Sequence, residues 1–333
     1  MARTRVGAMK FGDRRLAACE GAILAHSVDL DGTRLAKGRL LSAADLDAAR
    51  QAGRERLTVA EPSPADLRED DAASLITSAL SGSGLDARPP ANGRVDLVAR
   101  TRGLLCLDPR VIDRVNRIGE AIGLATLPAF ATVEAGEICA TLKIVPFAVR
   151  AAAAQRAAKA ASVQPLTVEP FRALSADLIH TQGENPTPKL EAKTAAVTRT
   201  RLEALGGRLT SERAVPHKVD SLGDALAEAG SDLVLVAGVS ATTDRRDVVP
   251  AAIRKSGGTV LRLGMPVDPG NLLLLARRGA QWIVGLPGCA RSPKRNGFDM
   301  VLERLFAGLP VSSRDIAALG AGGLLKGSER PSR

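Results

Sequence analysis

The sequence reads Asp232-Leu233-Val234-Leu235-Val236-Ala237 over six residues, a nearly continuous apolar run that is followed directly by Gly238. A strand that is apolar on both faces is typical of the centre of a parallel sheet, because helices cover both faces of such a sheet. Around this run, strand and helix patterns alternate from about residue 170 onward. The alternation predicts an α/β domain with a parallel or mixed, doubly wound sheet.

The predicted elements of this C-terminal half follow one another regularly. Strands are expected at residues 176–180, 208–215, 232–237, 259–263, 272–276 and 281–286. Helices are expected at residues 189–205, 222–229, 247–255 and 298–307. We assign the α/β domain to residues 169–327 and a short tail to residues 328–333.

The N-terminal half has a different, α+β pattern. A disordered lead-in at residues 1–9 is followed by a small β-rich unit at 10–60, with strands at 22–28, 34–41 and 57–60. The one helix of this unit should begin at the N-cap Ser42, with Asp45 as a variant capping box, and end at Gly53.

A second α+β unit is predicted at residues 61–150. Its helices are expected at 70–80 and 109–117, and its strands at 95–98, 103–107 and 138–145. Residues 151–161 are almost entirely alanine with Gln, Arg and Lys. Because alanine is the best helix former, we expect residues 151–168 to be a helical connector, with a disordered low-complexity segment as the alternative.

The composition favours a small anionic ligand. The chain has 333 residues, enough for two or more domains, and a net charge of +10. Six Phe, one Trp and no Tyr leave few aromatic faces on which single-stranded nucleic acid could stack. Arginines are scattered among acidic residues, without a long basic run. We therefore expect a phosphorylated ligand and no nucleic acid.

The cysteines and the apolar segments bear on the compartment. Cys19, Cys106, Cys139 and Cys289 lie far apart, a spacing that fits neither a zinc site nor a small disulfide scaffold. No apolar run approaches the roughly 18 residues of a membrane span, and no signal-peptide core follows the N-terminus. We expect a cytoplasmic protein that does not contact a membrane and forms a homo-oligomer.

The loop after the central strand is the first candidate site. It runs from Gly238 to Pro250 and opens a helix, whose N-terminus attracts anions. Glycine permits close backbone approach, hydroxyls come from Ser240, Thr242 and Thr243, and the carboxylates of Asp244 and Asp247 suit Mg²⁺ or a proton. In the alternative interpretation, the hydroxyls only cap the helix and Asp247 only complements its dipole.

A second loop, residues 285–297, follows the strand expected at 281–286. It contains Pro287, Gly288 and Cys289 and the charged residues Arg291, Lys294 and Arg295, which suit a phosphate or, alternatively, a solvated helix start. Between the two loops, Pro269-Gly270-Asn271 forms a turn that is alternatively a plain hairpin. Because ligands of open parallel sheets bind outside the carboxyl ends of the strands, we expect both loops to converge on one crevice.

These residues resemble the molybdopterin-binding domain shared by molybdopterin molybdotransferases and adenylyltransferases, over residues 173–310. The similar motifs are Ala237-Gly238-Val239-Ser240, the run Arg245–Pro250, Pro269-Gly270 and Leu286-Pro287-Gly288-Cys289-Ala290-Arg291-Ser292. Residues 20–27, 125–128 and 143–148 are similar to a bacterial subgroup in which this domain is often joined to a nucleotidyltransferase. Within the motifs, Ala237 replaces a glycine of the family, Cys289 an asparagine and His217 an acidic residue.

The resemblance implies molybdopterin as the ligand and assigns the site residues. Its phosphate would sit on backbone N–H groups at residues 238–243 and 287–292. The cofactor-binding residues would be Gly238, Val239, Ser240, Ala241, Thr242, Pro269, Gly270, Asn271, Pro287, Gly288, Cys289, Arg291, Ser292 and Lys294. Asp247, assisted by Asp244, would hold Mg²⁺ or position ATP or molybdate. A lone histidine near a strand end, such as His180 or His217, is more often a surface or capping residue than a catalyst.

Three classes of function follow. The first is an enzyme of molybdenum-cofactor biosynthesis that transfers a nucleotide or molybdate. The second is a non-catalytic carrier that presents the cofactor to a separate nucleotidyltransferase or apo-enzyme, which the departures from the family motifs favour. The third, a DNA-binding regulator, is weakened because the sequence has no recognisable recognition helix or basic stripe.

Overall fold

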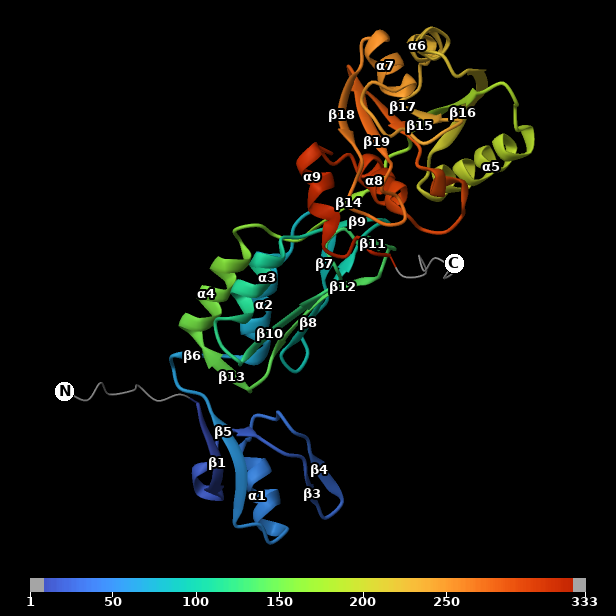
Figure 1. Ribbon diagram of the computed structural model, residues 1–333. Coiled ribbons are helices and arrows are strands. Elements are labelled where there is room, and N and C mark those ends of the chain that lie inside the picture. Colours follow the sequence, from blue (N-terminus) through green and yellow to red (C-terminus); the bar gives the residue numbers. More distant parts are fainter. Residues whose placement is uncertain (1–8, 326–333) are drawn as a thin grey trace, which may run out of the picture. The chain divides into compact units, whose positions relative to one another are not determined.

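The computed structural model describes residues 9–325 and divides the chain into two compact units, residues 1–169 and 170–333 (Figure 1). The expected lead-in, apart from Met9, and the expected tail lie outside the described residues. Within residues 9–325, every helix is too short or too polar to cross a membrane.

The first unit begins with a three-stranded antiparallel sheet. Its strands are ordered β1 (Lys10–Arg15), β5 (Arg56–Glu61) and β2 (Ile23–Leu24). The helix α1 (Ala43–Gln51) begins with the predicted capping box, in which Ser42 accepts a hydrogen bond from the backbone of Asp45. Leu24, Leu46 and Val59 belong to the buried core of this sheet and helix.

Two strands of this region are shorter than predicted. In place of strands at 22–28 and 34–41, the chain forms β2 and then a separate hairpin of β3 (Val28–Leu30) and β4 (Thr33–Leu35). The hairpin turns at Gly32, whose φ of 82° lies in the left-handed region that glycine adopts without strain. The chain therefore leaves the sheet after Leu24 and pairs with itself.

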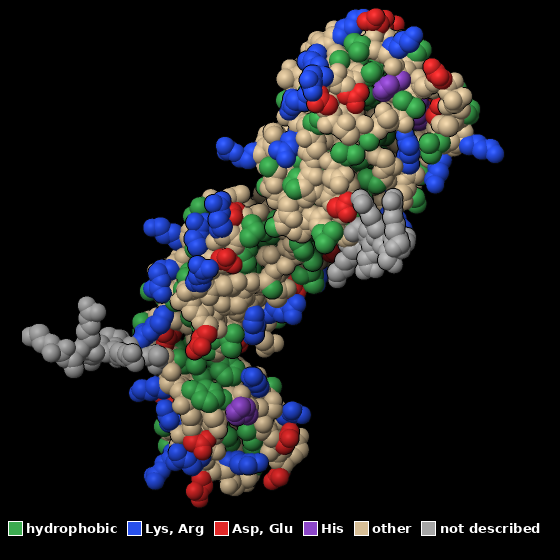
Figure 2. Space-filling model, viewed as in Figure 1, with side chains coloured by type: hydrophobic (Ala, Val, Ile, Leu, Met, Phe, Trp, Pro, Cys, Tyr) green, Lys and Arg blue, Asp and Glu red, His purple; other side chains and the backbone are tan. Residues whose placement is uncertain are grey.

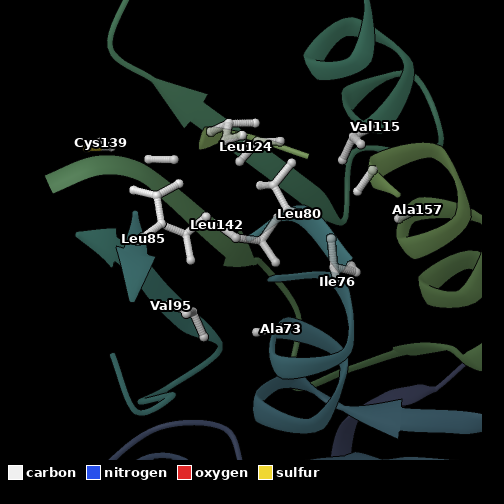
Figure 3. Close-up of a cluster of buried hydrophobic side chains, with 14 of the residues drawn as sticks. Ala73, Ile76, Leu80, Leu85, Val95, Val115, Leu124, Cys139, Leu142 and Ala157 are labelled. Carbon is white, nitrogen blue, oxygen red and sulfur yellow. The ribbon is translucent and has the colours of Figure 1, made fainter. Parts of the chain in front are cut away.

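A four-stranded antiparallel sheet and three helices form the rest of the first unit. The sheet order is β10 (Ile122–Thr126), β12 (Ile138–Ile144), β8 (Arg94–Ala99) and β7 (Leu85–Ala87). The helices are α2 (Glu69–Leu80), α3 (Pro109–Asn116) and α4 (Ala151–Ala161). Figure 3 shows side chains of α2, among them Ile76 and Leu80, beside Leu124 and Leu142 of the sheet. The remaining short strands are β6 (Asp66–Arg68), β9 (Gly103–Cys106), β11 (Thr132–Val133), β13 (Ala148–Arg150) and β14 (Thr167–Pro170).

The alanine-rich segment is helical over Ala151–Ala161, but the expected helix over residues 151–168 is too long, because β14 begins at Thr167. The helix packs into this unit. Ala154, Ala157 and Ala161 of α4 are fully buried and belong to the same core as α2 and the sheet. Small side chains at these positions let α4 approach its neighbours closely. The helix is therefore an integral part of the first unit's core.

The second unit contains the predicted α/β sheet, which has six strands. Their order is β16 (Arg208–Pro216), β15 (Ser175–Gln182), β17 (Leu233–Ala237), β20 (Gln281–Gly285), β19 (Leu274–Arg278) and β18 (Thr259–Leu263). The first four pair in parallel, whereas β19 is antiparallel to both of its neighbours. The predicted fold class, a mixed doubly wound sheet, is confirmed.

Helices cover both faces of this sheet, as the apolar run of β17 predicts (Figure 1). Leu233 and Leu235 share a core with α5 (Pro188–Ala204) and α8 (Gly297–Phe306). Val234 and Val236 share a core with α6 (Val219–Glu228) and α7 (Val248–Lys255). The short helix α9 (Ser313–Ala317) follows α8.

Charged side chains are interspersed on the surface. On the face that Figure 2 presents, Lys and Arg lie among Asp and Glu in both units. Many of them pair locally, as Arg100 does with Asp86 and Lys255 with Asp220. The surface on this face thus follows the scattered charge pattern of the sequence.

Candidate ligand-binding site

The two predicted loops begin side by side at one edge of the sheet. β17 and β20 pair in parallel, with Val236 opposite Gly285, so the loops that follow them leave from neighbouring carboxyl ends. A side chain joins the loops: the Arg291 Nη2 donates a hydrogen bond to the carbonyl oxygen of Gly238 over 2.8 Å. The structure therefore brings together the start of the first loop and the basic end of the second.

A cavity lies at the carboxyl ends of β15 and β17, beside the start of α5. Of the predicted site residues, Gly238, Val239 and Arg291 line it. The other lining residues belong to β15, to the β15–α5 connection, to α5 and to β17: His180, Thr181, Gln182, Gly183, Asn185, Pro186, Thr187, Leu190, Glu191, Thr194 and Ala237.

Hydrogen bonds tie the walls of this cavity together. The Thr181 hydroxyl accepts a hydrogen bond from the backbone N–H of Val239 over 3.0 Å and lies 2.8 Å from Nδ1 of His217. The Gln182 amide donates to both carboxylate oxygens of Glu191, each at 3.0 Å. The end of β15 is thus fastened to the first loop on one side and to α5 on the other.

His180 is buried in the wall of the cavity, with 3% of its surface exposed, so the expectation of a surface or capping residue is wrong for this histidine. It lies within β15, whose middle residues are covered by helices. Its Nε2 has no hydrogen-bond partner among the described residues, although Glu212 Oε1 lies 3.4 Å away. Burial lowers the pKa of the imidazole, which favours its neutral form.

The charges around the cavity suit an anionic group. Arg291 is half-buried at its edge, and α5, which is 17 residues long, begins there at Pro188. The N-terminus of such a helix carries a partial positive charge. Its first residue, Pro188, has no N–H, and the N–H groups of Leu190 and Glu191 donate to the carbonyl oxygen of Thr187. The carboxylate of Glu191 also lines the cavity; it accepts hydrogen bonds from the neutral amide of Gln182, and its negative charge partly offsets that of Arg291.

The two predicted catalytic carboxylates lie outside this cavity and have local partners. Asp247 is the N-cap of α7, and its Oδ1 accepts a hydrogen bond from the N–H of Val248 over 2.7 Å. Asp244 pairs with exposed Arg246 at 2.9 Å, and this hydrogen bond lowers the pKa of the Asp244 carboxyl. Among residues 9–325, no three His, Cys, Asp or Glu side chains are grouped so that they could hold a metal ion.

Other predicted residues also lie off the cavity. Ser240 and Ala241 are exposed, Thr242 is buried, and the turn at Pro269-Gly270-Asn271 packs on α8, where a Cβ at Gly270 would come within 2.6 Å of the Gly297 nitrogen. In the second loop, the predicted binding residues that do not line the cavity are Pro287, Gly288, Cys289, Ser292 and Lys294. Burial raises the pKa of the Cys289 thiol, which therefore stays protonated near neutral pH.

The connection from β15 to α5 forms one wall of the cavity, and it is not among the site residues predicted from the sequence. Its lining residues include Gly183, Asn185 and Thr187. A signal for it exists in the sequence, because Pro188 marks the first turn of a helix that directly follows a parallel strand. Such a strand-to-helix connection is a usual place for anionic ligands in doubly wound sheets.

Two parts of the chain match known protein families. Residues 179–307 match the family described as "Probable molybdopterin binding domain", and residues 14–61 match a domain of unknown function, DUF8806. The first match spans β15 to α8 and includes the cavity. It confirms the resemblance to the molybdopterin-binding domain family and supports a role in molybdenum-cofactor biosynthesis. No curated protein matches the chain.

Several solved structures are weakly similar. A molybdopterin biosynthesis MoeA protein from Pyrococcus horikosii is 14% identical, with 73% of this chain and 79% of that chain covered and a TM-score of 0.32. Molybdenum cofactor biosynthesis protein B is 16% identical, with coverage of 40% and 87% and a TM-score of 0.28. The protein CinA from Thermoplasma acidophilum is 19% identical, with coverage of 40% and 95% and a TM-score of 0.29. Likeness this weak carries no argument about the function of this chain.

Proposed function

We propose, from the match to a molybdopterin-binding domain at residues 179–307, that this chain binds molybdopterin with its phosphate in the small cavity at the carboxyl ends of β15 and β17. One observation carries the proposal: Arg291, from the loop after β20, reaches across to Gly238 and lines the cavity. A cation is thereby held beside the glycine at which the first loop leaves the sheet. The terminal phosphate of the pterin is the group that such an arrangement suits.

The phosphate would take its hydrogen bonds from Arg291 and from polar groups of the β15–α5 connection, and the positive dipole end of α5 would favour its charge. An arginine presents a planar fork that matches phosphate oxygens, and a helix N-terminus adds a favourable dipole. Gln182, Asn185 and Thr187 provide polar surface along the same cavity. These groups bind and orient a ligand without needing to exchange a proton with it.

The carrier interpretation is the second proposal, and the two acidic residues favour it over a transferase. Asp247 caps α7, and Asp244 is paired with Arg246. Among residues 9–325 no three His, Cys, Asp or Glu side chains are grouped as metal ligands, and we assign no step to Mg²⁺, ATP or molybdate. In this proposal the protein holds the cofactor for a separate nucleotidyltransferase or apo-enzyme.

Binding is tested with the purified chain and its Arg291→Gln variant. We expect mass spectrometry to find molybdopterin co-purifying with the unaltered protein. Loss of a charged hydrogen bond costs about 1.5–3 kcal/mol, so Arg291→Gln should weaken binding by about 10- to 100-fold. Lys294→Gln is the matched control, because this exposed side chain lies off the cavity. Equal losses in both variants would contradict the proposed site.

A second measurement separates carrier from enzyme. The loaded protein is incubated with ATP and magnesium, or with molybdate, and the pterin products are identified. A carrier keeps its pterin unchanged, whereas a transferase converts it to an adenylylated or metal-loaded form. Conversion that survives removal of contaminating enzymes would overturn the carrier proposal and leave molybdopterin binding intact.

A further inference from the structure

Arg201 is a buried arginine on α5 that lies outside the cavity. Only 8% of its side chain is exposed, and its guanidinium carbon is 5.9 Å from the centre of the Phe298 ring. Burying a charge is costly unless hydrogen bonds and an opposite charge compensate it. The partners of Arg201 therefore show what this charge holds in place.

The partners of Arg201 are concentrated in the second loop. Its Nη1 donates to the carbonyl oxygen of Ala290 over 2.7 Å, and its Nη2 donates to that of Ser292 over 2.6 Å and that of Lys294 over 3.1 Å. Its Nε donates to Oδ1 of Asp299 over 2.6 Å, which supplies the opposite charge. One side chain thus holds three carbonyls of a loop that has little secondary structure of its own.

These carbonyls flank the residue that lines the cavity. Ala290 and Ser292 are the two chain neighbours of Arg291, whose own side chain reaches Gly238. Fixing the carbonyls on both sides of Arg291 restricts the direction in which its side chain leaves the backbone. A continuous series of contacts thus runs from α5 through Arg201 and the loop to the cavity.

We propose that Arg201 is a positioning residue that orients Arg291 toward the anionic group of the ligand. The proposal rests on the proposed function for the identity of that ligand. The geometry requires an arginine, because its donors lie on three nitrogens in a planar fork, whereas lysine offers donors from one nitrogen only. Arg201→Lys, which keeps the charge, should therefore fail to restore the positioning.

A double-mutant cycle tests this role with molybdopterin as the probe. If Arg201 acts through Arg291, Arg201→Lys should weaken binding by about 10-fold. The Arg201→Lys, Arg291→Gln double variant should then bind no more weakly than Arg291→Gln alone. The matched control is Arg199→Lys, since Arg199 is an exposed arginine on the same helix. Losses in the two single variants that simply add in the double variant would overturn the proposal.

A ligand-independent readout uses Cys289, which lies in the same loop and is half-buried. We expect Arg201→Lys to raise the alkylation rate of Cys289 severalfold, while the fluorescence of Trp282, which lies in β20 of the same unit, stays that of the folded protein. An unchanged rate at Cys289, or a raised rate accompanied by the fluorescence of the unfolded chain, would overturn the positioning role. If the unaltered protein binds no molybdopterin, the proposed function fails, and this readout still decides whether Arg201 holds the loop.

Discussion

At the scale of single residues, local hydrogen bonds decide which polar groups are free for a ligand. Asp247 is the clearest case, because its carboxylate accepts the N–H of Val248 at the start of α7. An N-cap of this kind satisfies one of the N–H groups that a helix leaves without a partner. Arg291, by contrast, lies where its guanidinium can serve both Gly238 and a ligand.

The capping role of Asp247 predicts a difference between two substitutions. Asp247→Ala should lower the free energy of unfolding by about 1 kcal/mol, whereas Asp247→Asn, which still accepts a hydrogen bond, should cost much less. Urea denaturation of the two variants measures both values. If Asp247→Asn abolished molybdopterin conversion without loss of stability, the residue would have the catalytic role instead.

Cys139 predicts a loss of stability at high pH. It is buried in β12, and desolvation, assisted by the charge of Glu137, raises its pKa from 9.0 to about 11. The folded state thus keeps the thiol proton at pH values where the unfolded chain has lost it. The contribution of the protonated Cys139 thiol to the free energy of unfolding is complete below pH 9. It falls by about 1.4 kcal/mol per pH unit up to about pH 11.

Urea denaturation of the unaltered protein and of Cys139→Ala between pH 8 and pH 11 isolates this contribution. The substitution leaves a small cavity whose cost does not depend on pH, so the difference in stability between the two proteins should shrink as the pH rises. A difference that stays constant over this range would contradict the raised pKa.

At the scale of elements, the turn from α5 to β16 shows how closely the layers approach. A Cβ built on Gly206, which has a φ of 82°, would meet no atom within 4 Å. A Cβ built on Gly207 would lie 2.6 Å from the Phe306 ring of α8 and 2.7 Å from the Leu174 carbonyl oxygen. The first glycine is needed for its backbone conformation and the second for space.

Alanine substitutions should separate these two causes. Gly206→Ala should cost about 1–2 kcal/mol, because an L-residue is strained in the left-handed region. Gly207→Ala should cost more, up to about 3 kcal/mol, because a packed ring and a backbone carbonyl must shift. Thermal unfolding of both variants checks the order. A smaller cost at Gly207 would mean that α8 and β16 can move apart easily.

At the scale of the whole molecule, the chain has separate cores in its two units. Two buried clusters lie within residues 1–169 and two within residues 170–333. The match to the molybdopterin-binding domain and the cavity both fall in the second unit. A unit with its own core is expected to fold alone.

Residues 170–333, produced alone, should therefore unfold cooperatively and bind molybdopterin with the affinity of the full chain, within about twofold. Calorimetry and a binding titration against the full chain provide the comparison. A cooperative but non-binding fragment would show that residues 1–169 contribute to ligand binding. In that case, residues 1–169 would have a role in binding the ligand.

Much of the second unit can be predicted from its sequence, because buried parallel strands and amphipathic helices leave strong patterns. The run at β17 and the order of the elements after it are examples. The first unit is harder to predict at its short strands, since the hairpin of β3 and β4 depends on where Gly32 lets the chain turn. Burial of α4 is likewise invisible in a sequence of alanines, because alanine forms helices both in cores and in connectors.

For the candidate site, the sequence by itself determined the two loops at the carboxyl ends of β17 and β20, since strand direction follows from the order of the elements. Only the tertiary structure decided that Arg291 joins the loops, that Arg201 donates to the carbonyl oxygens on either side of Arg291 and that His180 is buried in the cavity wall. These hydrogen bonds link residues that lie 53 to 91 positions apart. No local pattern encodes such pairs, because packing of the whole sheet brings them together.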